Sequence, residues 1–167
     1  MSQRQRRYTL KSKESKQLLA KASEKLKMEL ESTFGAKTDV EIVEADFGGL
    51  LLVDGKPVLF KLGEEVLPTL VSAEILAQLP KVVVDMGAVR FVCNGADVMA
   101  PGIRRIEVNP AKGSLVVVVD EKYGKPLALG EMLIDADKAR TATQGPVVKN
   151  KHYVTDRVWN AAKALAE

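Results

Sequence analysis

The chain has 167 residues, of which 46% are hydrophobic and 28% charged, and its formal net charge is +3. This composition is typical of a soluble globular protein with one or two small domains, and it excludes a disordered, collagen-like or coiled-coil chain. The apolar runs are far shorter than the roughly 18 residues that cross a bilayer, so we expect no membrane-spanning segment, no signal peptide and no membrane partner.

The charges are distributed unevenly along the chain. Residues 1–30 carry nine Lys or Arg and three Glu, a net charge of +6, whereas residues 31–80 carry three Lys and nine Asp or Glu, a net charge of −6. Residues 81–167 carry thirteen Lys or Arg and ten Asp or Glu, a net charge of +3. Basic regions on both sides of an acidic stretch favour an anionic partner.

The N-terminal region begins with basic residues and continues into a predicted helix. Residues 1–8, which include Arg4, fit a mobile arm or an edge strand. From residue 13 to residue 34 apolar side chains recur every three or four positions, as they do on one face of an amphipathic helix. Ser12 is the expected N-cap and Gly35 the expected stop. The lysine-rich opposite face fits either solvent, a nucleic acid or a membrane surface.

A short antiparallel sheet is predicted next. Residues 40–47 alternate like a strand with one exposed face, and Gly48-Gly49 is expected to turn the chain. Two apolar runs, 50–53 and 58–62, then flank Asp54-Gly55, which is a strong hairpin signal.

A second helix and a domain boundary are expected after this sheet. Residues 64–79 place apolar side chains at helical intervals, interrupted by Pro68, and the pattern ends at Pro80. We therefore expect an N-terminal helix-and-sheet domain over residues 1–80 and a second domain over residues 81–167.

The second half of the chain is predicted to be mostly strand. Residues 135–145 have no clear pattern, and Asp156 is expected to begin a short C-terminal helix. Short strands at regular spacing are typical of a small barrel or sandwich, so the predicted fold class is α+β. The expected strands are residues 81–85, 88–94, 104–108, 115–119 (buried on both faces), 127–134 and 147–154.

One stretch, residues 89–103, combines several turn signals. A predicted strand runs into Gly95, where a positive φ or a close backbone approach is possible. Residues 96–99 leave room for a single helical turn, which Pro101 and Gly102 would end. On spacing alone this is equally a structural corner between strands or a binding site.

The side chains that most enzymes need are scarce. Cys93 is the only cysteine and His152 the only histidine, so no zinc-type ligand set exists, and we expect no metal, no cofactor and no catalysis. A Cys93–His152 nucleophile and base pair is the one formal alternative. A cysteine on the apolar face of a strand is usually packed, and we interpret His152 as a structural or RNA-stacking residue. A single unpaired cysteine also fits a reducing, cytoplasmic location.

The turn-rich stretch resembles a known RNA-binding domain. Residues 95–103, Gly-Ala-Asp-Val-Met-Ala-Pro-Gly-Ile, are similar to the G-A-x-V-x-x-P-G-[IV] signature of PUA domains, and residues 124–130 also resemble that domain. Residues 149–159 resemble the N-x-H-Y-x-x-D-x-x-W ending of the malignant T-cell-amplified sequence family. That family has a helix-and-sheet (pre-PUA) module before a PUA-type β pseudo-barrel, so the resemblance covers nearly the whole chain.

The resemblance implies RNA binding in translation, with tRNA or small-subunit ribosomal RNA as the target. Phosphate contacts would supply salt-sensitive affinity, and shape most of the selectivity. Alternation along the last strand would place Lys149, Lys151 and Tyr153 on one face, as a second wall together with His152. The residues implied for the groove and its phosphate contacts are Gly95, Ala96, Asp97, Met99, Pro101, Gly102, Arg104, Arg105 and Lys125.

Two other functions fit the sequence. The acidic N-terminal domain could dock a translation-factor or RNA-modification protein, which would make the chain an adaptor. An RNA-modifying enzyme is disfavoured, because about 80 residues before the PUA-like half are too few for a usual modification domain. Eukaryotic members of the family carry a second Pro-Gly soon after the first, whereas Arg104-Arg105-Ile106 continues into a strand here. Their protein-partner contacts are therefore not carried over.

Overall fold

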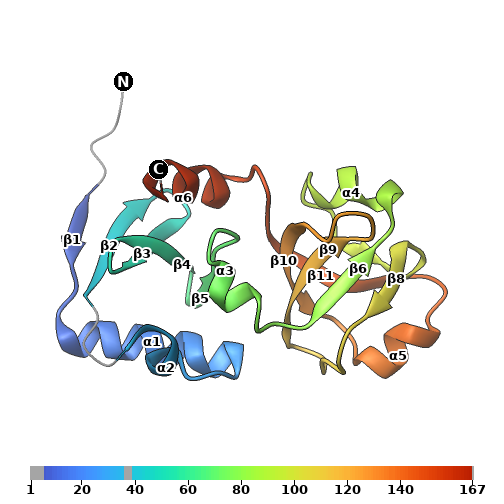
Figure 1. The fold of residues 1–167 in the computed structure, drawn as a ribbon, viewed down its shortest axis with the longest axis horizontal. Helices are drawn as coiled ribbons and strands as arrows, with labels where there is room; N and C mark the ends of the chain where they lie inside the picture. Colours follow the sequence, from blue (N-terminus) through green and yellow to red (C-terminus); the bar gives the residue numbers. More distant parts are fainter. Residues whose placement is uncertain (1–5, 36–38, 167) are drawn as a thin grey trace.

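The chain forms two domains that lie side by side, each built around its own sheet (Figure 1). The structure is a computed structural model that describes residues 6–35 and 39–166. The N-terminal arm with Arg4 therefore lies partly outside the described residues. The expected α+β class, with a helix-and-antiparallel-sheet domain followed by a β-barrel domain, is confirmed. Within the described ranges, no helix is both long and apolar enough to span a bilayer.

The N-terminal domain contains a five-stranded antiparallel sheet in the order β1-β2-β3-β4-β5. The hairpin predicted at Asp54-Gly55 is confirmed, because these two residues join β3 to β4. Gly48 was expected in a turn, but it begins β3 and pairs with Ala45 and Leu62. The strands are β1 (Arg7–Thr9), β2 (Val40–Ala45), β3 (Gly48–Val53), β4 (Lys56–Leu62) and β5 (Glu65–Pro68).

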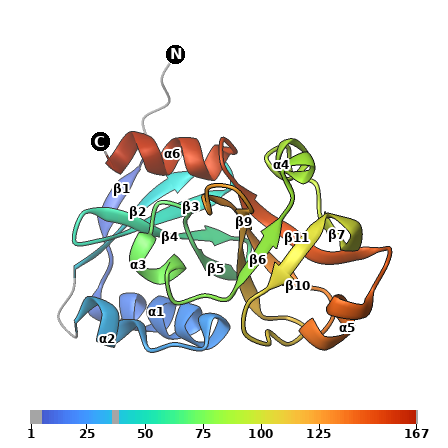
Figure 2. The same ribbon diagram turned by 45° about the vertical axis from the view of Figure 1, so that its right-hand side comes forward.

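Helices cover this sheet on two sides. In Figures 1 and 2, α1 (Ser12–Leu26) and α2 (Leu30–Phe34) lie below the sheet and α6 (Arg157–Ala166) lies above it. Every residue from Leu50 to Val53 in β3 is consequently buried. The C-terminal helix, expected at the end of the second domain, thus packs on the sheet of the first, where it contacts β3 and β4.

Two helix predictions in this domain need correction. The predicted helix 13–34 is two helices, because Lys27 adopts a left-handed conformation (φ 56°) and ends α1. Ser12 is the first helical residue and not a capping side chain. The predicted helix 64–79 is strand β5 followed by the short helix α3 (Ala73–Leu76). Pairing with β4 and burial under α1 favour a strand there, although the apolar spacing also fits a helix.

The C-terminal domain is a six-stranded, nearly closed barrel in the order β7-β11-β10-β9-β6-β8, with β6 and β9 parallel. The strands predicted near residues 81, 104, 115, 127 and 147 are confirmed. Residues 135–145, expected to be irregular, contain α5 (Ala136–Thr141). The strands are β6 (Lys81–Val84), β7 (Val98–Met99), β8 (Ile103–Ile106), β9 (Leu115–Asp120), β10 (Pro126–Met132) and β11 (Pro146–Tyr153).

The predicted strand 88–94 is instead a helix, α4 (Met86–Val92). Asp85 caps it, since its carboxylate accepts a hydrogen bond of 2.9 Å from the backbone N–H of Ala88. Val89, Val92 and Cys93 pack against the barrel core at helical spacing. The helical turn expected at residues 96–99 is absent, because β7 occupies Val98–Met99 and a 3-10 turn, η1, follows at Ala100–Gly102.

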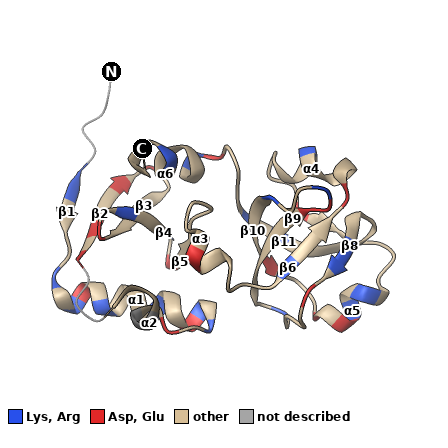
Figure 3. Ribbon diagram, viewed as in Figure 1, with Lys and Arg blue, Asp and Glu red and all other residues tan. Residues whose placement is uncertain are grey.

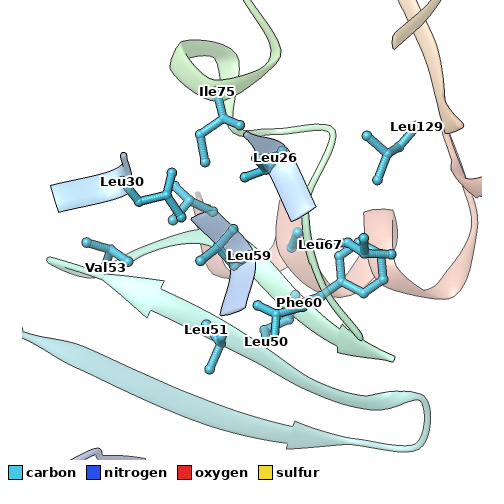
Figure 4. Packing of buried hydrophobic residues seen from close by; sticks show 14 of the residues in the cluster. Leu26, Leu30, Leu50, Leu51, Val53, Leu59, Phe60, Leu67, Ile75 and Leu129 are labelled. Carbon is cyan, nitrogen blue, oxygen red and sulfur yellow. The ribbon is translucent and has the colours of Figure 1, made fainter. Parts of the chain in front are cut away.

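One hydrophobic cluster spans both domains, and a second fills the interior of the barrel. In β9, Val116 and Val118 face the interior of the barrel, whereas Leu115, Val117 and Val119 belong to the cluster that fills the N-terminal domain. Figure 4 shows this cluster, with Leu129 of β10 approaching Leu67 and Phe60. The predicted burial of β9 on both faces is confirmed, and its second face is covered by the other domain.

An ion pair and two hydrogen bonds border this apolar contact between the domains. The Lys25 ammonium of α1 pairs with Glu131 of β10 and donates a hydrogen bond of 3.2 Å to the carbonyl of Gly113. Lys27 reaches the hydroxyl of Ser114 at 3.3 Å. Part of the lysine-rich face of α1 is therefore engaged between the domains and not directed at an anionic partner.

Candidate functional site

The candidate site, which we call the α4 surface, comprises α4 and the residues at its two ends. These are Gly102, Arg104, Arg105 and Lys125 at the N-terminal end and the turn 95–97 at the C-terminal end. At the N-terminal end of the helix, the backbone N–H of Asp85 donates a hydrogen bond of 2.9 Å to the carbonyl of Gly102. Gly102 lies against Ala88, where an added Cβ would be 3.3 Å from the Ala88 methyl group. The Pro101-Gly102 turn is thereby held close to the start of the helix.

Three exposed cationic residues lie on the elements beyond this end of α4: Arg104 and Arg105 on β8, and Lys125 in the β9–β10 turn. Arg104 follows Gly102 on β8, and its Nε atom lies 2.8 Å from the Glu121 carboxylate. The N–H of Glu121 donates a hydrogen bond to the carbonyl of Val84, so the β9–β10 turn, which contains Lys125, lies beside the end of β6 (Figure 1). Figure 3 shows Lys and Arg positions in blue on β8. The side chain of Arg104 remains 60% exposed and keeps free donors for an anion.

Arg105 is also exposed, because the pairing of β6 with β8 shifts by one residue between Val83 and Val84. Val83 pairs with Arg105 and Val84 with Ile103, so Arg104 has no partner on β6. Arg105 forms a 3.5 Å ion pair with Glu107, and its side chain is 66% exposed. Ion pairs this exposed contribute little stability, so both guanidinium groups can exchange their partners for phosphates.

At the C-terminal end of α4, Asn150 of β11 holds the turn that follows the helix. Its Nδ2 donates hydrogen bonds of 3.0 Å to the carbonyls of Val92 and Ala96, and its backbone N–H donates to the Asp97 carboxylate at 2.9 Å. The Asn150 Oδ1 atom is buried without a partner among the described residues. Sequence reasoning assigned Ala96 and Asp97 to the groove but gave no role to Asn150.

Gly95 lies in this turn and contacts the second wall of the site. Its φ is 94°, and an added Cβ would be 3.1 Å from the ring of Tyr153. Tyr153, which was predicted for the opposite wall of the groove, thus packs directly against the Gly95 turn.

Replacement of Gly95 by alanine is expected to destabilise the protein by about 2 kcal/mol, because the left-handed conformation alone costs an L-residue about 1 kcal/mol and the Tyr153 ring must also move. Gly145 is a matched control, since its φ is 91° and nothing lies within 4 Å of an added Cβ. Urea unfolding of both variants should show the larger loss for Gly95→Ala. Equal losses would contradict the proposed contact with Tyr153.

The remaining predicted residues of β11 do not share one face. The ladder with β10 shifts between Leu129 and Gly130, so that Lys151 has no partner strand residue and forms a bulge. Tyr153 packs on the barrel core, whereas Lys151 points to the other domain and pairs with Glu65 at 2.8 Å. Lys149 is exposed opposite Glu131, on the face of the sheet opposite to Tyr153. The predicted common face of Lys149, Lys151 and Tyr153 is therefore wrong.

His152 is fully buried between the domains, so its expected place on an RNA-facing wall does not agree with the structure. Its Nε2 atom accepts a hydrogen bond of 3.0 Å from the backbone N–H of Leu70, and Nδ1 lies 2.8 Å from the Asp156 carboxylate. A backbone N–H can only donate, so the ring is the neutral tautomer protonated at Nδ1. The Phe60 ring packs edge-on at 5.1 Å. His152 thus joins the two domains.

Asp156 completes this buried network at the start of α6. Burial opposes its ionisation, but the hydrogen bond from the Nδ1–H of His152, together with those from the N–H groups of Trp159 and Tyr153, leaves the pKa of the carboxyl below its usual value. The N-x-H-Y-x-x-D-x-x-W ending therefore has two structural roles. Asn150 holds the turn after α4, and His152 connects the two domains.

The formal Cys93–His152 pair has no support in this geometry. Both ring nitrogens of His152 are engaged by Leu70 and Asp156, and burial raises the pKa of the Cys93 thiol, which disfavours the nucleophilic thiolate. In the part of the chain that the structure describes, no three His, Cys, Asp or Glu side chains are grouped to hold a metal ion.

Met99, which was predicted, is 48% exposed and pairs with Pro146 of β11. Other exposed residues of the α4 surface were missed by the sequence reasoning. Phe91 is 55% exposed with the Arg90 guanidinium 4.9 Å from its ring centre, and Met86 is 41% exposed. Assigning residues 88–94 to a strand hid these side chains, because only the helix turns Phe91 outward.

Asp120 fixes the β9–β10 turn. It is 4% exposed, and its carboxylate accepts hydrogen bonds from the backbone N–H groups of Tyr123, Lys125 and Lys122. These bonds, that from Tyr123 foremost, lower the pKa of the carboxyl because they stabilise its charged form.

Because its folded-state pKa is depressed, Asp120 should stabilise the protein above its unfolded pKa of about 3.9, and this contribution should be lost as the pH falls through the folded-state value. Asp120→Asn should therefore lower the urea midpoint at neutral pH, and the difference from the parent should shrink below about pH 4. Urea titrations at about pH 7, 5, 4 and 3 check this. A difference that stays constant with pH would contradict it.

A nearly closed barrel whose short helix is bracketed by glycine turns defines this second domain as a PUA domain, and residues 80–154 match the PUA domain family model. Residues 6–73 match the model of a domain of unknown function, DUF1947. A hypothetical protein from Pyrococcus horikoshii, known from its crystal structure, has 31% identity and a TM-score of 0.78, with 94% of this chain and 99% of that chain covered.

Relatives of similar length establish the family. An uncharacterized protein of Methanocaldococcus jannaschii is 41% identical over 86% of this chain and 93% of its own length. Translation machinery-associated protein 20 of Saccharomyces cerevisiae is 29% identical over 85% of this chain and 83% of its own. The chain belongs to the two-domain family, DUF1947 followed by PUA, that includes translation machinery-associated protein 20 and the malignant T-cell-amplified sequence proteins.

Proposed function

We propose that the protein is a non-catalytic RNA-binding protein of translation, which contacts tRNA or small-subunit ribosomal RNA in the cytoplasm through the α4 surface. The observation that carries the proposal is the group of exposed cations, Arg104, Arg105 and Lys125, beside the close backbone turn at Gly102. Guanidinium and ammonium groups bind the phosphates of a nucleic-acid backbone.

The printed names of relatives support the link to translation. Translation machinery-associated protein 20 matches most of this chain, and a protein named as a probable tRNA pseudouridine synthase B is similar over 51% of this chain. The engaged ring of His152 and the raised pKa of Cys93 support the absence of catalysis. Lys151 and His152 are left out of the proposed RNA contacts because both side chains are used between the domains.

The test is a salt titration of RNA binding to the purified full chain. Each phosphate neutralised contributes a slope of about −0.7 to −0.9 in a plot of log K against log salt. Three cations therefore predict a slope of about −2 or steeper, and an affinity loss of about tenfold or more between 50 and 200 mM salt. Binding that does not change with salt, or no binding to tRNA or small-subunit RNA, would contradict the proposal.

A second candidate, a protein-docking adaptor, is favoured by a cavity of about 470 Å³ in the N-terminal domain. Its floor includes the buried side chains of Val58 and Ile75, and its rim carries two exposed carboxylates, Asp54 and Glu74, and one exposed cation, Lys56. An apolar pocket with acidic groups at its mouth fits an apolar side chain next to basic ones. Affinity isolation from RNase-treated extract separates the two functions, since only a direct protein contact survives RNase.

A further inference from the structure

The β9–β10 turn displays a tyrosine that the proposed groove does not use. Tyr123 is 64% exposed, the largest exposed fraction of any aromatic side chain among the described large hydrophobic residues. Its ring therefore presents an open apolar face, with a polar hydroxyl, to a ligand.

The turn that carries Tyr123 is rigid. The carboxylate of Asp120 accepts hydrogen bonds from the N–H groups on both sides of the turn and from Tyr123 itself. The N–H of Gly124 donates to the Asp120 carbonyl at 3.1 Å, and the N–H of Glu121 donates to Val84 at 2.9 Å. The ring is thus presented by a pre-organised backbone, which lowers the entropy lost on binding.

Two ammonium groups flank the ring. Lys122 Nζ lies 5.1 Å from the Tyr123 ring centre and Lys125 Nζ lies 5.9 Å from it. An exposed contact between a lysine and an aromatic ring favours the contacting state only about two- to fivefold over the separated state. Stacking of a nucleic-acid base on an aromatic ring shifts binding about five- to 150-fold. A base can therefore displace a lysine from the ring face, and the freed ammonium can pair with a neighbouring phosphate.

The turn also adjoins the cations of the α4 surface. Arg104 is ion-paired to Glu121, the first residue of the turn, and Lys125 closes the turn on the other side. An RNA strand that follows Arg104 and Lys125 consequently passes beside Tyr123. Arg104, Lys122 and Lys125 outnumber the two carboxylates of this region, Asp120 and Glu121, so its net charge is +1 and favours an anionic partner such as a nucleic acid.

We propose that Tyr123 is a stacking platform for an unpaired base of the bound RNA, with Lys122 and Lys125 on the flanking phosphates. This rests on the proposed RNA-binding function and narrows its ligand class. Bases inside an A-form duplex are stacked on their neighbours and cannot reach a side chain on the protein surface. The α4 surface therefore takes RNA with an exposed single-stranded segment.

The experiment measures binding of the full chain to two fluorescein-labelled RNAs, a hairpin with a single-stranded tail and a blunt duplex of the same sequence. Tyr123→Ala should weaken binding to the tailed hairpin about tenfold and change duplex binding less than twofold. Tyr123→Phe keeps the ring and should bind within about twofold of the parent. Tyr8→Ala is the matched control, because Tyr8 is also exposed (41%) beside a cation, Arg6, on the other domain.

A second readout reports stacking itself. With 2-aminopurine placed in the tail, binding to the parent and to Tyr123→Phe should quench its fluorescence, whereas binding to Tyr123→Ala should not. Equal affinity and quenching for Tyr123→Ala and the parent would overturn the stacking proposal, and would leave RNA binding intact if salt-sensitive binding persists. No RNA binding by the parent protein would instead overturn the proposed function.

Discussion

Replacing His152 with alanine is expected to lower the free energy of unfolding by about 3 kcal/mol. The change leaves a cavity beside Phe60 and removes the acceptor for the Leu70 N–H and the donor for Asp156. For a chain of this size, the midpoint of thermal unfolding should fall by about 6 to 12 °C. Urea unfolding measures the loss directly, and hydrogen exchange at the Leu70 amide should accelerate because the bond between the domains is gone.

Two variants control this prediction. Lys149→Ala changes an exposed residue of the same strand and should alter stability by less than about 0.5 kcal/mol. His152→Gln offers a side-chain oxygen to the Leu70 N–H and should retain part of the stability. A His152→Ala loss below about 1 kcal/mol would show that the histidine does not join the domains. RNA affinity measured at a temperature where the variant is folded should stay within about twofold of the parent.

The double substitution Arg104→Glu with Arg105→Glu is expected to weaken RNA binding on the order of 100-fold at moderate salt. Each lost charge-assisted hydrogen bond to phosphate removes about 1.5 kcal/mol, and the new carboxylates repel the RNA. The salt slope should also become shallower by about one to two. Fluorescence anisotropy with tRNA at several salt concentrations measures both quantities.

The matched control for this variant is Lys13→Glu with Lys16→Glu on α1, which makes the same change in net charge at exposed positions of the other domain. It should reduce affinity only a few-fold, through long-range electrostatics. Equal losses for both double variants would mean that RNA senses net charge and not the α4 surface. Thermal unfolding of each variant excludes misfolding as the cause.

The sequence predicted features whose causes are local. Asp54-Gly55 between apolar runs specifies a hairpin through turn chemistry, and the five consecutive apolar residues 115–119 specify burial on both faces. Which element covers the second face could not be predicted, because the N-terminal domain reaches β9 only through the tertiary fold.

The sequence predicts a strand at α4, because the spacing of its apolar residues fits both the two-residue repeat of a strand and the repeat of a helix. Val89, Phe91 and Cys93 alternate like a strand, but Val89, Val92 and Cys93 form one face of a helix, and Asp85 caps it. The error mattered for the site, since it concealed the outward position of Phe91.

The faces that the β11 side chains occupy could not be predicted from the sequence, for a different reason. A single-residue bulge at Lys151 changes which face each following side chain occupies, and no residue in the segment signals a bulge. Lys151 and His152 therefore both lie at the domain interface, and the bulge places Tyr153 on the opposite face, beside Gly95. The PUA signature around Gly95 and Pro101-Gly102 predicts the two turns that border α4, and their role in RNA binding stays a prediction.

The most direct test of the central proposal is ultraviolet crosslinking of the full chain to RNA, with sequencing of the RNA and mass spectrometry of the crosslinked peptides. The expected RNAs are tRNA or small-subunit ribosomal RNA, and the expected peptides contain α4, the Gly102–Arg105 segment or the turn around Tyr123. Crosslinks confined to the N-terminal domain, or none above the background of an unrelated protein, would contradict the proposal.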